Sequence, residues 1–506
     1  MRCASMCCST RRPSRRLWWP VARATISLLD LIRRHPCIHP ATRSGNQWPD
    51  RAPAPVPGSA APPGRPPAPP PSRRRAFGAM VRRVMRLANE APVPAKGSFA
   101  DGYGPVARRF AHQLATGEET GASLSVYHRG EPVVDLWGGL ADRESERDWE
   151  QDTRIVLFSV TKGFAAMALA LLVDRGQLDL DAPVASYWPE FGQAGKQAIT
   201  VRTLLGHRAG LAYLDEAITL DQCVDPSCRE VVLRAIERQR PAWTPGEKQG
   251  YHAVTFGLYA RELFERIAGE PMAAFLRREL LDPLESDVHL GAPAELDHRH
   301  ATLYPPATPE RVGRMVAAAL LAPESTEGRA TRAVLAPSSI ARKALGVAKM
   351  GRAGVGAYAS PPVRRVNLAW ASATGSAEGI ARAYLPFAAG GEHGGRRFLK
   401  ASTLEPIYAR QSWSERDLVL QKPVGWSQGF LKEERHLFCP NPESFGHAGV
   451  GGPLGWADPV DQITFGYALN ASDWRVRSPR ALALCRALYD SPALLDRSPA
   501  SRPLNR

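Results

Sequence analysis

A serine and a lysine three positions apart, in the stretch Phe158-Ser159-Val160-Thr161-Lys162, are the residues most suited to chemistry. Apolar residues and strong helix formers follow through 163–173, which predicts a buried helix beginning at this serine. Residues three apart share one face of a helix, so the Lys162 amine can accept the proton of the Ser159 hydroxyl. Free N–H groups at the helix N-terminus can stabilise a developing negative charge. Ser159 is therefore a candidate nucleophile, although an N-capping serine followed by a solvated lysine fits the same residues equally well.

Other elements must position this helix. Both ends of the chain have a mixed α/β pattern, and its middle has a helical pattern. Apolar and β-branched patterns predict strands at 123–127, 132–137, 447–456 and 463–469. Helical patterns predict helices at 106–114, 200–207, 254–267 and 480–489. We therefore predict one sheet built from both chain ends, with a helical insert at about residues 180–420.

The charge of the chain is concentrated near its start. The net charge is +15, but residues 1–80 hold 14 Arg and 2 Asp, which leaves only +3 for residues 81–506. The folded part is nearly neutral, so nucleic acid is not an expected partner. Ten prolines within 53–71 predict a disordered basic leader over 1–80, and translation starting at Met80 is an alternative. We expect one folded domain at 81–495 and a flexible tail at 496–506.

Three further motifs give the Ser159 stretch its context. Trp243-Thr244-Pro245-Gly246 precedes Tyr251-His252, and Gly446-His447-Ala448-Gly449 lies far downstream. In this order the motifs resemble the serine β-lactamase and penicillin-binding-protein-like superfamily. Within it they look most like class C β-lactamases and the β-lactamase-like (family VIII) carboxylesterases. The resemblance covers about residues 100–490 and implies an α/β (α+β) fold with an antiparallel sheet flanked by helices.

The resemblance also implies roles for individual residues. Ser159 would be the acylated nucleophile, with Lys162 and Tyr251 as a general base pair. A free tyrosine has a pKa near 10, so Tyr251 serves only if positive charge nearby, such as Lys162, lowers it. The backbone N–H groups of Ser159 and Val450 would form the oxyanion hole. His447 and Gly449 would bind substrate, and no metal or organic cofactor is implied.

Two departures from the lactamase pattern favour ester hydrolysis. Ala253 stands where lactamases carry the Asn that holds the substrate amide, and His447 replaces the lysine that contacts the substrate carboxylate. A neutral imidazole is a weaker anion anchor at pH 7. We therefore expect a carboxylesterase acting on small-molecule esters. A β-lactamase or D-Ala-D-Ala carboxypeptidase-like peptidase is the alternative, and a non-catalytic binding protein on the same fold is a second one.

Other residues have competing interpretations. Gly425-Trp426-Ser427-Gln428-Gly429 matches the nucleophile elbow of α/β-hydrolases, but no helix start follows it. His207 and His252 are interpreted as structural. Cys223 and Cys228 lack the second pair that a zinc site requires, and free thiols are the favoured interpretation.

The sequence contains no convincing export signal, because Pro20 and Arg23 interrupt the apolar stretch near the N-terminus and Asp30 stands where a small-residue cleavage site would be needed. That stretch is also too short to span a bilayer. We therefore expect a cytoplasmic protein without a stable membrane span. The sequence leaves the oligomeric state open.

Overall fold

The computed structural model describes residues 95–432, 438–475 and 477–495. The leader expected at 1–80 and the tail expected at 496–506 lie outside the described residues. No helix among the described residues is long and apolar enough to cross a membrane.

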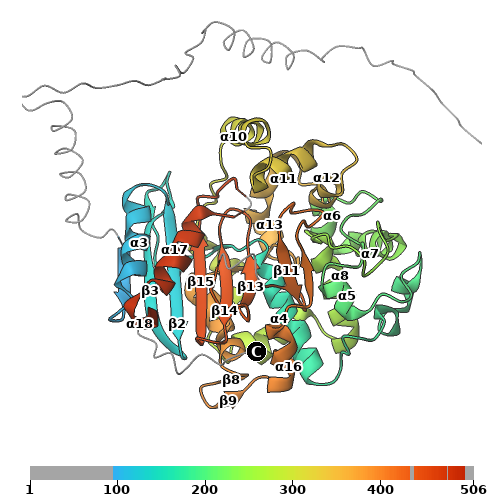
Figure 1. Ribbon diagram of the computed structural model, residues 1–506, viewed down its shortest axis with the longest axis horizontal. Coiled ribbons are helices and arrows are strands. Elements are labelled where there is room, and N and C mark those ends of the chain that lie inside the picture. Colours follow the sequence, from blue (N-terminus) through green and yellow to red (C-terminus); the bar gives the residue numbers. More distant parts are fainter. Residues whose placement is uncertain (1–94, 433–437, 476, 496–506) are drawn as a thin grey trace, which may run out of the picture. The chain divides into compact units, whose positions relative to one another are not determined.

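A large antiparallel sheet joins the two ends of the described chain (Figure 1). Its strand order is β1-β3-β2-β15-β14-β13-β12-β11-β10, and β4 pairs with β3. The strands are β1 Ala95–Phe99, β2 Gly121–His128, β3 Glu131–Asp142, β4 Arg147–Asp148, β10 Ser412–Ser414, β11 Val424–Ser427, β12 Phe430–Leu431, β13 Phe445–Ala448, β14 Leu454–Asp458 and β15 Ile463–Leu469. The pairing of β2 with β15 confirms the prediction of one sheet built from both ends.

Two small sheets accompany the large one. The first has the order β5-β7-β6, from Ile155–Val156, Thr374–Gly375 and Val288–His289. The second pairs β8 Glu392–His393 with β9 Arg396–Arg397. The single strand predicted at 447–456 is wrong, because the chain turns at residues 449–453 and forms the hairpin β13–β14 instead. Gly451 and Gly452 adopt positive φ values of 87° and 131° in that turn, a backbone conformation that glycine allows.

The helices cover both faces of the large sheet and fill the middle of the chain. They are α3 Gly104–Ala115, α4 Val160–Asp174, α5 Val201–Leu205, α6 Leu220–Val224, α7 Arg229–Arg238, α8 Thr255–Ala268, α9 Met272–Leu276, α10 Thr308–Leu321, α11 Thr326–Leu335, α12 Ile340–Leu345, α13 Pro361–Arg364, α14 Ala377–Ala383, α15 Leu385–Ala388, α16 Ala401–Tyr408, α17 Pro479–Tyr489 and α18 Pro492–Leu495. Most of them lie within the segment expected as a helical insert, and α14 within that segment packs on β15.

Strand β15 shows how the two faces are divided. Its odd-numbered residues, such as Phe465 and Tyr467, belong to the apolar cluster that includes α3 and α17. Its even-numbered residues face α14, and Ala468 belongs to the cluster that includes α4. A Cβ at Gly466 would lie 2.0 Å from the Ala377 carbonyl oxygen, so only glycine allows α14 this close. Because both faces are covered, every residue of β15 is buried.

Helix α4 lies between the sheet and the helical segment, in contact with β13 on one side and α8 on another. All its residues from Val160 to Leu172 are buried. A helix surrounded by protein must be apolar on all sides, which explains the unbroken apolar run after Lys162. The N-terminus of α4 is thereby held at the junction of the two parts.

Candidate active site

The chain turns abruptly into α4 at Phe158. Strand β5 ends at Val156, and Phe158 adopts a left-handed backbone conformation with φ of 48°. A positive φ is strained for a bulky residue and is typical of functional sites. Ser159 follows at the N-cap position of α4, where its hydroxyl makes no capping hydrogen bond. The hydroxyl therefore remains available for chemistry.

Lys162 lies one turn along α4 and is fully buried. Its Nζ lies 3.2 Å from Ser159 Oγ and donates to the Trp370 carbonyl oxygen at 3.0 Å. The interpretation of Ser159 as a cap followed by a solvated lysine is therefore wrong. None of the ion pairs among the described residues involves Lys162, and burial lowers its pKa well below the usual 10.5. A neutral amine beside Oγ can accept the hydroxyl proton directly.

The charge of Lys162 affects the expected pKa of Tyr251. We expected a positive Lys162 to lower the pKa of Tyr251, whereas burial favours the uncharged amine. Tyr251 Oη donates to Ser159 Oγ at 3.0 Å, and Lys162 Nζ lies 5.0 Å from the centre of the Tyr251 ring. Both groups are thus within reach of the same hydroxyl, and together they can relay one proton.

Two residues that sequence analysis missed position Tyr251. Asp417 Oδ1 accepts the Tyr251 backbone N–H at 3.1 Å, as well as the N–H groups of Val419 and Leu420. The Trp426 ring stacks on the Tyr251 ring, with 5.2 Å between centroids and 4° between planes. Asp417 carried no sequence signal, since it lies in no motif. Trp426 lies within the match to the nucleophile elbow that sequence analysis rejected. Its aromatic character was the signal that could have indicated stacking on Tyr251.

His447 lies on β13 and is only 3% exposed. Its Nδ1 donates to the Ala448 carbonyl oxygen at 2.9 Å, and its buried Nε2 has no partner among the described residues. Burial holds the pKa of His447 well below its usual range. The ring is therefore neutral, and Nε2 is an acceptor that cannot bind a carboxylate by charge.

The turn after β13 packs directly against the segment that precedes Ser159. A Cβ at Gly449 would lie 2.5 Å from the Leu157 carbonyl oxygen and 3.3 Å from Phe158 Cβ, which explains the glycine. Val450 follows with its side chain 50% exposed, so any role falls to its backbone. Neither the Ser159 N–H nor the Val450 N–H has an acceptor within the described part of the chain. Both can donate to an oxyanion.

The competing nucleophile lies in a different environment. Ser427 is fully buried at the end of β11, and its Oγ donates to the Pro406 carbonyl oxygen at 2.8 Å. The chain then turns at Gln428 and Gly429 into strand β12, whereas a nucleophile elbow leads into a helix. This geometry leaves no path for a substrate to Ser427.

Of the two histidines near Tyr251, the His207 ring makes structural contacts, whereas both buried ring nitrogens of His252 lack a partner among the described residues. His207 Nδ1 accepts the backbone N–H of His252 at 3.1 Å, and its ring packs on Trp426 with 4.1 Å between centroids. Burial lowers the pKa of His252 to about 3.

Cys223 and Cys228 are free thiols. Within the described residues, no group of three or more His, Cys, Asp or Glu is placed to hold a metal ion.

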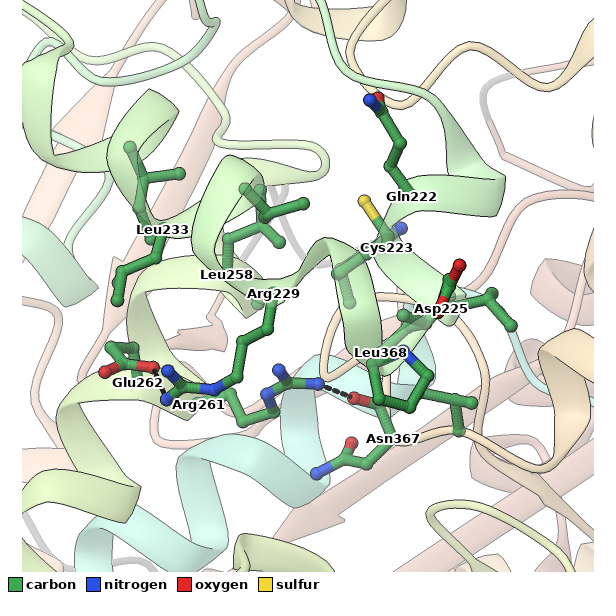
Figure 2. Close-up of a pocket in the computed structure, with 17 residues that line it drawn as sticks. Gln222, Cys223, Asp225, Arg229, Leu233, Leu258, Arg261, Glu262, Asn367 and Leu368 are labelled. Carbon is green, nitrogen blue, oxygen red and sulfur yellow. Dashed lines mark hydrogen bonds and ion pairs between the residues drawn. The ribbon is translucent and has the colours of Figure 1, made fainter. Parts of the chain in front are cut away.

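A cavity of about 190 Å³ lies beside the site (Figure 2). Helices α6, α7 and α8 and the segment 366–370 line it, with Leu233, Leu258 and Leu368 among the apolar side chains. Ser159, Lys162 and Tyr251 are not in its wall. Trp370 lines the cavity, and its carbonyl oxygen accepts a hydrogen bond from Lys162 Nζ, so the cavity adjoins Lys162 through this residue.

Comparison with known proteins identifies the family of the chain. The model of the beta-lactamase family matches residues 106–487. The chain belongs to the beta-lactamase family. Among its relatives, the "Esterase/beta-lactamase LipL" of Mycobacterium tuberculosis is 33% identical over 373 residues, which cover 72% of this chain and 80% of the relative.

Two solved structures are similar over most of the chain. A family VIII carboxylesterase has a TM-score of 0.64 at 33% identity, covering 78% of this chain and 99% of that one. A penicillin-binding protein homologue from Caulobacter crescentus has a TM-score of 0.64 at 32% identity, with the same coverage. These likenesses confirm the predicted antiparallel, helix-flanked fold and the superfamily.

Proposed function

We propose that this protein hydrolyses small-molecule carboxylic esters through an acyl-enzyme on Ser159. The observation that carries the proposal is the convergence of two groups on one hydroxyl. Lys162 Nζ and Tyr251 Oη lie 3.2 and 3.0 Å from Ser159 Oγ, and the buried amine has no carboxylate partner among the described residues. Such a pair activates a serine at neutral pH.

The reaction proceeds in two balanced halves. Ser159 Oγ attacks the ester carbonyl carbon while its proton passes to the Lys162–Tyr251 pair, and the backbone N–H groups of Ser159 and Val450 stabilise the oxyanion. Collapse of the intermediate breaks the bond to the alkoxide, which takes the proton from Tyr251 Oη. Water then attacks the acyl-serine and gives a proton to the same pair, which returns it to Oγ as the carboxylic acid leaves.

The substrate-binding residues support esters over lactams. His447 is neutral and offers a lone acceptor nitrogen, and Ala253 has no amide to hold a lactam side chain. The neutral His447 favours a substrate without a carboxylate, and Ala253 favours one without the lactam side-chain amide. The relative from M. tuberculosis is named both esterase and beta-lactamase, which keeps lactam hydrolysis as the second candidate.

A matched pair of variants tests the nucleophile. We expect Ser159→Ala to abolish hydrolysis of a short-chain p-nitrophenyl ester and labelling by a fluorophosphonate, while Ser427→Ala retains both. Activity that survives the first change but not the second would contradict the assignment. A chromogenic cephalosporin and a D-Ala-D-Ala peptide, assayed in parallel, discriminate the alternatives.

A protein that turns over none of these substrates and is not labelled at Ser159 would be a binding protein on a hydrolase fold. Cephalosporin turnover faster than ester cleavage would reverse the order of the two enzymatic candidates. A cytoplasmic location stays a prediction, which fractionation of the producing cell would test.

A further inference from the structure

His207 follows the short helix α5, which packs against α8 (Figure 1). Gly206 closes the helix, and His207 comes next with a backbone φ of 58°, in the left-handed region. Glycine adopts this conformation readily, whereas a Cβ makes it unfavourable, so helix ends of this kind ordinarily carry glycine. Other residues held in this conformation cluster at functional sites. The backbone of His207 therefore indicates a role for its side chain.

The His207 side chain is fully buried, and its neighbours fix the direction of its ring. The ring packs on Trp426 with 4.1 Å between centroids and on Phe256 with 5.3 Å. Its Nδ1 accepts the backbone N–H of His252 at 3.1 Å, so the neutral ring carries its proton on Nε2. Burial holds the pKa of His207 well below its usual range, which keeps Nδ1 available as an acceptor.

His207 holds the segment that carries Tyr251 on both sides of that tyrosine. The His207 carbonyl oxygen accepts the Gly250 N–H at 3.1 Å, and its Nδ1 accepts the His252 N–H. Between these two groups, Asp417 Oδ1 accepts the Tyr251 N–H at 3.1 Å. Three successive backbone N–H groups are thus hydrogen-bonded, two of them to one residue. A segment held in this way has little freedom to shift the ring that it carries.

We propose that His207 is a positioning residue for Tyr251. By fixing the backbone at 250–252, its carbonyl oxygen and its Nδ1 keep Tyr251 Oη 3.0 Å from Ser159 Oγ. A displacement of about 1 Å between reacting groups can lower a rate by about 100-fold, so this restraint affects catalysis although His207 touches no reacting atom. The role rests on the proposed esterase function, in which Tyr251 relays the Ser159 proton.

Two substitutions of His207 separate its acceptor from its ring. His207→Phe keeps an aromatic ring without an acceptor, and we expect kcat for a short-chain p-nitrophenyl ester to fall by about 10- to 100-fold with KM little changed. His207→Asn loses the ring but retains an oxygen near the position of Nδ1, and asparagine tolerates a left-handed backbone. It should recover most of kcat. A kcat that follows the urea midpoints of the variants, and not the presence of the acceptor, would indicate a purely structural role and overturn the proposal.

His252→Phe is the matched control. The His252 side chain is also fully buried, and both its ring nitrogens lack a partner among the described residues, so this change removes no hydrogen bond. Its kcat should stay close to that of the wild type, and a fall equal to that of His207→Phe would overturn the proposal. Tyr251→Phe tests the route of the effect: in this background, His207→Phe should lower the remaining kcat by less than about 2-fold. A full additional loss in the double variant would also overturn the proposal.

Hydrogen exchange measures the restraint on the backbone directly and does not require catalysis. The His252 N–H has no acceptor besides His207 among the described residues, so one amide of a peptide covering 249–253 should exchange about 10-fold faster in His207→Phe but not in His207→Asn. Equal exchange in the two variants would overturn the proposal. If His207→Phe does not fold, His207→Leu, which is closer in size to histidine, removes the same acceptor. Faster exchange in either variant, together with no ester hydrolysis by the wild type, would support the positioning and contradict the esterase function, so the two failures are distinguishable.

Discussion

Replacing Lys162 by methionine should lower activity and, at neutral pH, remove a cost to stability. Methionine has a similar length but carries no proton, so it occupies the same buried position without a base. The loss of a positioned base lowers kcat/KM by about 10²- to 10⁴-fold. The effect on stability follows from burial of the amine, which lowers its pKa well below 10.5 in the folded state.

The sign of the pH effect can be worked out from protons bound. Between the folded pKa and 10.5 the unfolded chain holds a proton on Lys162 that the folded chain does not. Wild-type stability therefore rises with pH across this window, by up to about 1.4 kcal/mol per unit. The variant lacks this slope, and the unpaired Trp370 carbonyl costs it about 1–3 kcal/mol at every pH. As pH falls, the free energy of unfolding of Lys162→Met should therefore increase relative to that of the wild type.

Urea unfolding of both proteins at several pH values between 7 and 10 measures this difference, together with ester hydrolysis. Lys248→Met, at an exposed lysine, is the matched control. The difference between its free energy of unfolding and that of the wild type should not change with pH. If the free energies of unfolding of wild type and Lys162→Met differ by the same amount at every pH in this range, Lys162 is charged in the folded protein. The neutral-amine mechanism would then be wrong.

Two further substitutions test how the site is positioned. Asp417→Ala leaves three backbone N–H groups without an acceptor, including that of Tyr251, and should lower the free energy of unfolding by about 3 kcal/mol. Its kcat should fall more than its KM changes, and Asp417→Asn, which retains an oxygen, should recover most of the loss. Gly449→Ala should reduce kcat by about 10- to 100-fold. The new Cβ would lie 2.5 Å from the Leu157 carbonyl oxygen, so it must displace the turn at 449–453 that carries the proposed oxyanion donor, the Val450 N–H. The control Gly313→Ala adds a methyl group that meets nothing within 4 Å, so an equal loss of activity there would contradict this reasoning.

Sequence analysis determined the elements whose signals are local. The apolar run after Lys162 predicted a buried helix, and α4 spans Val160–Asp174 as expected. The hairpin of β2 and β3 and strand β15 were likewise readable, because periodic apolar residues reveal which segments are covered. The order of the Ser159, Tyr251 and His447 motifs then indicated the family. The strand predicted at 447–456 was wrong, since its glycines mark a turn that apolar content alone does not reveal.

Tertiary structure alone decided the chemical state of the site. Sequence spacing could place a lysine beside Ser159, but only the packing of α4 between β13 and α8 shows that this amine is buried, and burial lowers its pKa. Asp417 and Trp426 lie more than 160 residues beyond Tyr251, and long-range contacts of this kind leave no periodic trace in the chain. The stretch around Ser159 thus pointed to a candidate nucleophile, while the low-dielectric environment of the neighbouring lysine depends on residues brought together by folding.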